Sequence, residues 1–123
     1  MRTLFLVYMI VEAIFGIGFL FNPGFVMDPM GVTLDETATT FARLLGSLII
    51  SIPVLLFFAR RSAGTEFKKG VVYSLFIYLF LSTILLLISQ LNGLMNAMGW
   101  GIVLLHFAFM IWFGYYILNP GKN

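Results

Sequence analysis

Residues 3–21 read TLFLVYMIVEAIFGIGFLF, a run in which Glu12 is the only charged side chain. A helix rises about 1.5 Å per residue, so a run of this length crosses a hydrocarbon core about 30 Å thick. Three further apolar runs of similar length follow, at residues 41–59, 71–91 and 98–118. The sequence therefore predicts an all-α fold in which a single domain spans a lipid bilayer four times.

The composition excludes an ordinary soluble domain. Hydrophobic residues make up 61% of the 123 residues and charged residues 10%, whereas charged residues are about a quarter of a typical soluble domain. The chain has no cysteine, which excludes disulfides, thiolate nucleophiles and cysteine-ligated metals. The formal net charge is +2, but the basic residues lie mainly at the ends of the apolar runs, so we expect no nucleic-acid partner.

The distribution of basic residues predicts the topology. If the four spans alternate in direction, Arg2, the loop from Arg60 to Lys69 and Lys122 share one side of the membrane. The link at residues 22–40 falls on the other side and carries only acidic charges. The positive-inside rule then places both termini in the cytoplasm, as in a multi-pass protein of a cell inner membrane. The later links are short, so we expect an up-down-up-down four-helix bundle.

Local signals predict where helices begin, bend and end. Residues 22–24, Asn-Pro-Gly, should end the first helix, because proline disfavours a helical residue before it and glycine permits a sharp exit. Thr33 and Glu36 have the spacing of a capping box, so the second helix should begin before its apolar run. Pro53 lies within that run and should kink the helix, leaving the carbonyl of Ile49 without its usual donor.

Each apolar run carries polar or small residues that recur on one helical face. Such stripes turn toward each other in lipid. Counting from the centre of each run places Glu12, Ser51, Ser82 and His106 in roughly one layer, with Tyr78 just below it. Arg43 lies about 10 Å outward of the centre of its run, and we expect it to face the other helices. These six residues are the candidate polar or proton site.

Glu12 and His106 form the sharpest candidate pair. A lone carboxylate at the centre of a bilayer is unfavourable by about 2.5 to 3.5 kcal/mol or more, so it should be neutral, paired or hydrated. His106 lies at matching depth, and we expect the two side chains to be in direct or water-bridged reach. Three readings stay open: the pair holds two helices together, it forms a proton or ligand site, or the residues do not meet.

Other chemistry is not favoured by the sequence. His106 and Met110 lie one turn apart on one helix and so cannot bind opposite faces of a haem iron, although a single histidine ligand is conceivable. The serines with His106 lack a placed acid and oxyanion donors, so they do not define a hydrolase. We therefore expect no enzyme activity, no cofactor, no metal and no catalytic residue.

The first half of the chain resembles a loose group of small bacterial four-helix membrane proteins. The shared pattern is a proline-containing exit from helix one, here Asn22-Pro23, followed by Gly31, Asp35 and the Arg43-Leu-Leu-Gly46 motif on helix two. The group implies the four-helix fold and no established activity. A four-span chain with one glutamate midway along helix one is also similar to the small multidrug resistance exporters, in which such a glutamate exchanges protons for cationic drugs. That resemblance implies such a role for Glu12.

Two functions follow from these observations. The first is a non-enzymatic membrane component, a subunit that binds a membrane protein partner or assembles as a homo-oligomer. The second is a proton-linked permease, or a binder of a small hydrophobic or cationic molecule, that uses Glu12 and His106. A closed polar seam favours the first function, and a cavity of ligand size favours the second.

Overall fold

The computed structural model describes residues 1–119, and the regular elements among these residues are all helical. The elements are α1 (Arg2–Phe21), α2 (Pro23–Met27), the 3₁₀ helix η1 (Asp28–Met30), α3 (Glu36–Ile49), α4 (Ser51–Arg61), α5 (Thr65–Leu91) and α6 (Gly99–Leu118). Four segments are long and apolar enough to cross a membrane: α1, α3 together with α4, α5 and α6. The all-helical architecture agrees with the fold class expected from the four apolar runs.

Charge and capping, as well as hydropathy, set the helix ends. α5 begins at Thr65, before its apolar run starts at residue 71. The charged segment in front of the run is therefore also helical. Lys69 Nζ lies 2.8 Å from Glu66 Oε1 within that segment, a spacing that supports an exposed helix. The second apolar run is likewise part of a longer segment, Glu36–Arg61.

α3 begins before its apolar run, as predicted, but its cap is not the predicted one. The N-cap residue is Asp35, whose side-chain oxygen accepts a hydrogen bond from the backbone N–H of Ala38 at 2.7 Å. The Thr33–Glu36 capping box is therefore wrong. Aspartate is among the strongest N-cap residues, and its charge also suits the positive end of a helix.

The link between α1 and α3 contains two short helices that the sequence does not predict. α1 ends at Phe21, as expected, and Asn22 then caps α2 by accepting a hydrogen bond from the N–H of Phe25 at 3.2 Å. Pro23 is the first residue of α2, and Pro29 is the second residue of η1. Proline is tolerated there because the first N–H groups of a helix have no intrahelical acceptor. The two prolines therefore start helices where the sequence indicates only turns.

The structure shows an interruption of the helix just before Pro53, where the sequence predicts a kink. α3 ends at Ile49 and α4 begins at Ser51, with Ile50 between them. Pro53 has no N–H to donate to the carbonyl of Ile49, and its ring crowds that carbonyl. The long segment is consequently divided into two helices three residues before the proline.

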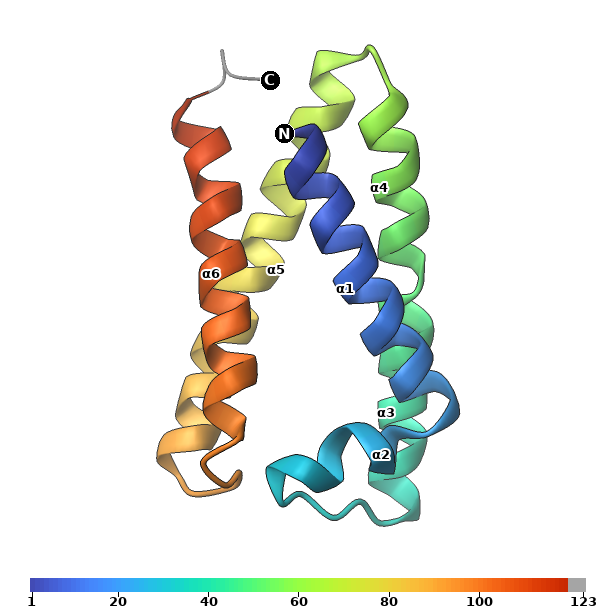
Figure 1. Cartoon of the computed structure of the whole chain (residues 1–123), viewed down its shortest axis with the longest axis vertical. Coiled ribbons are helices and arrows are strands. Elements are labelled where there is room, and N and C mark those ends of the chain that lie inside the picture. Colours follow the sequence, from blue (N-terminus) through green and yellow to red (C-terminus); the bar gives the residue numbers. More distant parts are fainter. Residues whose placement is uncertain (120–123) are drawn as a thin grey trace.

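The helices form two groups that are close at one end and separate toward the other. α1 packs along α3 and α4, while α5 packs along α6. Figure 1 shows that α1 is inclined, so that its first turns lie near α5 while its last turns lie beside α3. α2 and η1 lie across the end at which α1 finishes, and α6 ends at the same end of the molecule as α1 begins.

The packed core lies where the two groups are close. Tyr8 is at its centre, with its ring centroid 4.7 Å from that of Phe109 and 5.2 Å from that of Phe113. The buried members of the core come from α1, α4, α5 and α6: Leu4, Phe5, Tyr8, Leu56, Ala59, Val71, Val72, Leu75, Leu79, Phe109 and Phe113. The core therefore closes one half of the molecule and leaves the other half less tightly filled.

Two glycines allow α1 to approach the neighbouring helix backbone to backbone. A Cβ atom at Gly16 would lie 2.9 Å from the backbone nitrogen of Ile50. A Cβ atom at Gly46 would meet the backbone of Phe19 and Leu20, at 2.8 Å from the carbonyl carbon of Phe19. Both distances are shorter than an ordinary van der Waals contact. The position of α1, and of the side chains it carries, therefore depends on these glycines.

Candidate binding cavity

A cavity of about 400 Å³ lies between the two helix groups, on the side of the core nearer α2. Its walls come from α1, α3, α5 and α6, and α2 and η1 contribute Val26, Met27 and Met30. Small-molecule sites in proteins have volumes of about 300–1,000 Å³, and one water occupies about 30 Å³ in the liquid. The space is thus of ligand size rather than of single-water size.

Polar groups on three helices line this cavity. α1 contributes Tyr8 and Glu12, α5 contributes Tyr78 and Ser82, and α6 contributes His106. The remaining lining is mostly apolar. An apolar cavity with a few convergent polar groups is the usual composition of a small-molecule site.

Glu12 is buried, with 6% of its surface exposed. The Tyr8 hydroxyl, one turn earlier on α1, is also buried and makes no hydrogen bond of ordinary length with a described residue. Tyr8 and Tyr78 line the same cavity as Glu12. No described Lys or Arg lines the cavity. The cavity wall that Glu12 shares therefore carries two tyrosines and no described Lys or Arg.

The hydrogen bond of His106 fixes its tautomer. Nδ1 lies 2.9 Å from the backbone carbonyl oxygen of Ile102, and because a carbonyl only accepts, Nδ1 must carry the proton. In the neutral ring Nε2 is then an acceptor, and no described residue bonds to it. The ring centroid of Tyr78 lies 6.3 Å from that of His106. Tyr78 thus lies beside His106 on the wall of the cavity that Glu12 also lines.

The structure brings four of the six candidate residues to the cavity wall: Glu12, Tyr78, Ser82 and His106. Glu12 and His106 were expected within direct or water-bridged reach; no direct bond joins them among the hydrogen bonds and ion pairs of residues 1–119, and water-bridged reach stays a prediction. The two side chains face a shared space instead.

The other two candidates, Arg43 and Ser51, lie outside the cavity. Arg43 is exposed, so the expectation that it faces the other helices is wrong. Ser51 is exposed and donates to the carbonyl of Leu48 at 2.6 Å, and Ser47 donates in the same way to Leu44 at 2.7 Å. Because a serine can satisfy its hydroxyl on the preceding turn of its own helix, a row of serines does not require a polar partner on another helix.

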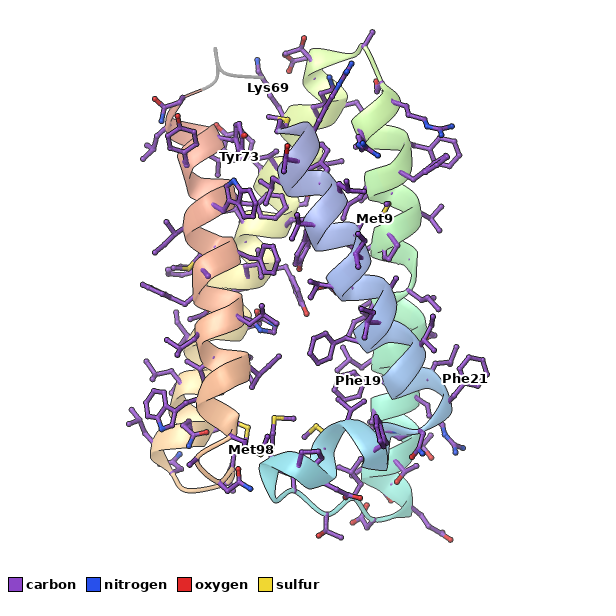
Figure 2. All side chains as sticks on the ribbon, viewed as in Figure 1. Met9, Phe19, Phe21, Lys69, Tyr73 and Met98 are labelled. Atoms are coloured by element: carbon purple, nitrogen blue, oxygen red, sulfur yellow. The ribbon has the colours of Figure 1, made fainter. Side chains whose placement is uncertain are left out.

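Several lining residues are apolar and were not candidates from sequence. Phe19 lines the cavity, whereas Phe21 is exposed, and Figure 2 shows them on opposite sides of α1. Met27, Met30 and Met95 line the cavity from the short helices and from the link between α5 and α6. A signal that could have identified them is the group of methionines in the two links on the same side of the bundle, because methionine suits adaptable apolar sites.

Asn96 joins the two links at this end of the cavity. Its backbone N–H donates to the carbonyl of Met30 at 2.8 Å, and its side-chain Nδ2 donates to the carbonyl of Pro29 at 2.9 Å. Gln90 of α5 donates in turn to the carbonyl of Asn96 at 3.0 Å. These bonds hold η1 against the link between α5 and α6, at the α2 end of the cavity.

Fold and cavity together define a small helical protein whose apolar helices are compatible with a membrane location. The chain belongs to the family described as a domain of unknown function, DUF8292, whose model matches residues 6–121. No curated protein and no solved structure matches the chain. The comparisons show no likeness to the small multidrug resistance exporters.

Proposed function

We propose that this chain is an integral membrane protein that binds a small hydrophobic molecule in the cavity lined by Glu12 and His106. The observation that carries the proposal is the cavity of about 400 Å³ between the two helix groups. A subunit whose polar groups served only to join helices would be expected to close around them, because interhelical contacts in membranes depend on close packing. The binding role therefore has stronger support than the role of a partner-binding subunit.

The outward surface supports insertion as a four-helix up-down-up-down bundle. Large apolar side chains are exposed along every long helix, among them Ile14, Leu48, Leu85 and Leu104. In water, apolar patches of this extent are unfavourable. In a bilayer, helices satisfy their own backbone groups and present such side chains to lipid.

The orientation follows from charge. The link between α4 and α5 lies at the end of the molecule where α1 begins and α6 ends (Figure 1), and Arg60, Arg61, Lys68 and Lys69 lie in or beside it. We place this end in the cytoplasm of a cell with an inner membrane, by the positive-inside rule. A reporter fused after Asn123 should then be active in its cytoplasmic form, and activity only in the exported form would reverse the orientation.

Binding can be tested with a neutral probe in membrane-reconstituted protein. We expect saturable binding of para-fluorophenylbutanol, detected by fluorine NMR as a bound signal separate from probe dissolved in the bilayer. Ser82→Leu places a larger apolar side chain in the cavity and should strongly weaken this signal. Ser74→Leu makes the same change on the exposed face of α5 and should leave binding unchanged.

A second cavity-filling variant, Ser89→Leu, guards against a folding defect in the first, because Ser89 also lines the cavity. Absence of saturable binding to the wild-type chain would contradict the proposal and favour the partner-binding role. Binding that survives both Ser82→Leu and Ser89→Leu would place the site elsewhere.

A further inference from the structure

We infer that the ligand is a hydrophobic amine whose protonated nitrogen lies between Glu12 and His106, at the deep end of the cavity. This inference rests on the proposed function and names the chemical class of the ligand. It is carried by the positions of the polar groups, their hydrogen-bonding roles and the charge of the cavity wall.

The polar groups lie deep, and the apolar lining lies nearer the end closed by α2. Glu12 precedes Asn22 by ten residues, which is about 15 Å along α1. His106 follows Gly99 by seven residues, about 10 Å along α6. Toward the α2 end the lining is mostly apolar and includes Phe19, Met30 and Met95, with the hydroxyl of Ser89 as its polar group. A ligand that satisfies this cavity has its polar head inward and its apolar body outward.

This polarity excludes a phospholipid as the matching occupant. A phospholipid keeps its head group at the membrane interface, outside the hydrocarbon core. Its acyl chain would fill the apolar part and bring no polar group to the carboxyl of Glu12 or to Nε2 of His106. A small molecule with one polar head can leave the membrane interface, so it can place its head beside Glu12 and His106 and its apolar body toward the α2 end of the cavity.

The polar groups call for a donor. Nε2 of His106 is an acceptor because Nδ1 donates to Ile102, and an ionised Glu12 only accepts. The described cavity wall carries no Lys or Arg, so a cation on the ligand meets a carboxylate that has no other charged partner. The half-buried Tyr78 also lines the cavity, and an aromatic ring can face a cation favourably. A protonated amine meets all of these conditions.

Three probes with one skeleton test the inference: para-fluorophenylbutylamine, the corresponding alcohol and the parent hydrocarbon. Hydrogen bonds to charged groups are stronger than neutral ones by about 1 to 1.5 kcal/mol, which is roughly tenfold in affinity. We therefore expect the amine to bind about tenfold more tightly than the alcohol, and the hydrocarbon to bind most weakly. Affinities are compared after correction for partition into vesicles without protein.

Glu12→Gln is the decisive variant because glutamine keeps the shape of the side chain and cannot carry the charge. The substitution should lower the affinity for the amine about tenfold, to that of the alcohol, and change the affinity for the alcohol by less than about threefold. Glu36→Gln is the matched control, since Glu36 is exposed on α3, and it should leave all three affinities unchanged.

Acid should weaken binding of the amine, because a proton competes with the ligand for the Glu12 carboxylate. The titratable groups that line the cavity with Glu12 are Tyr8 on the same helix, Tyr78 on α5 and His106 on α6. The described lining from α2, η1 and α3 contains none, and no residue of α4 lines the cavity. Protonation of His106 adds a repelling charge, so its effect has the same sign. The pH dependence should be reduced in Glu12→Gln.

The outcomes separate this inference from the proposed function. Equal affinities for the amine and the alcohol, or unchanged binding of the amine to Glu12→Gln, would overturn the inference that the ligand is an amine. The cavity would remain a binding site. Retention of only phospholipid, seen by native mass spectrometry, with no binding of the amine would also overturn it. Failure of all three probes to bind would overturn the proposed function itself.

Discussion

Replacement of Gly46 by alanine should separate α1 from α3 and destabilise the wall of the cavity. A Cβ atom at this position would lie 2.8 Å from the carbonyl carbon of Phe19 and 2.9 Å from Cα of Leu20. Carbon atoms pack best at about 3.5–4.0 Å, so the backbones must move apart by roughly half an ångström or more. The obstacle is helical backbone, which cannot rotate out of the way as a side chain can.

The expected destabilisation is that of an overpacked interface. Inserting a methyl group into a well-packed contact typically raises the free energy of the folded state by about 1–3 kcal/mol. That corresponds to about a 5- to 150-fold change in the unfolding equilibrium. Gly101→Ala is the matched control, because a Cβ atom at Gly101, on α6, would have nothing within 4 Å. Alanine favours helix over glycine by about 1 kcal/mol, so the control should be neutral or stabilised.

Unfolding in mixtures of a mild detergent and sodium dodecyl sulfate, followed by far-UV circular dichroism, measures the difference. We expect Gly46→Ala to unfold at a lower fraction of dodecyl sulfate than both the wild type and Gly101→Ala. Equal stability of the two variants would show that α1 and α3 do not make the close approach described above. The reasoning from the glycine contacts would then be refuted.

Two further predictions concern the end of the molecule near α2. Asp35→Ala should lower the free energy of unfolding by about 1 kcal/mol through loss of the α3 cap, whereas Thr33→Ala should have little effect; equal effects would contradict the assignment of the cap. Asn96→Ala removes the bond to the carbonyl of Pro29, so hydrogen exchange should quicken in residues 23–30 and not in the middle of α6; unchanged exchange in the short helices would contradict this bond.

The polar residues of the cavity could be predicted because ionisable groups are rare in apolar runs. The four apolar runs contain one carboxylate, Glu12, and one imidazole, His106. Counting along each helix placed the two residues at similar depth. Tyr78 and Ser82 followed from their shared face on α5. Depth and helical face depend only on local geometry, which the sequence determines directly.

Periodicity did not predict whether a polar helical face turns toward the other helices or toward the outside. Arg43 and Ser51 share a face of the second apolar run, but that face is exposed. Which face of α3 meets α1 is decided by the close approach at Gly46, a contact between distant segments. The short helices α2 and η1 were also missed, because a proline that begins a helix and one that ends it look alike in a short link.

The most direct measurement of the central claim is competitive photolabelling of the membrane-reconstituted chain. The probe is a phenylbutanol that carries a diazirine, used with and without an excess of unlabelled phenylbutanol, and the labelled peptides are mapped by mass spectrometry. A ligand in the cavity should give labels that the competitor removes at lining residues such as Phe15, Met30 and Met95, while labels at the exposed Ile14 and Leu85 persist. Labels that the competitor removes nowhere, or only at exposed positions, would contradict the cavity as a binding site.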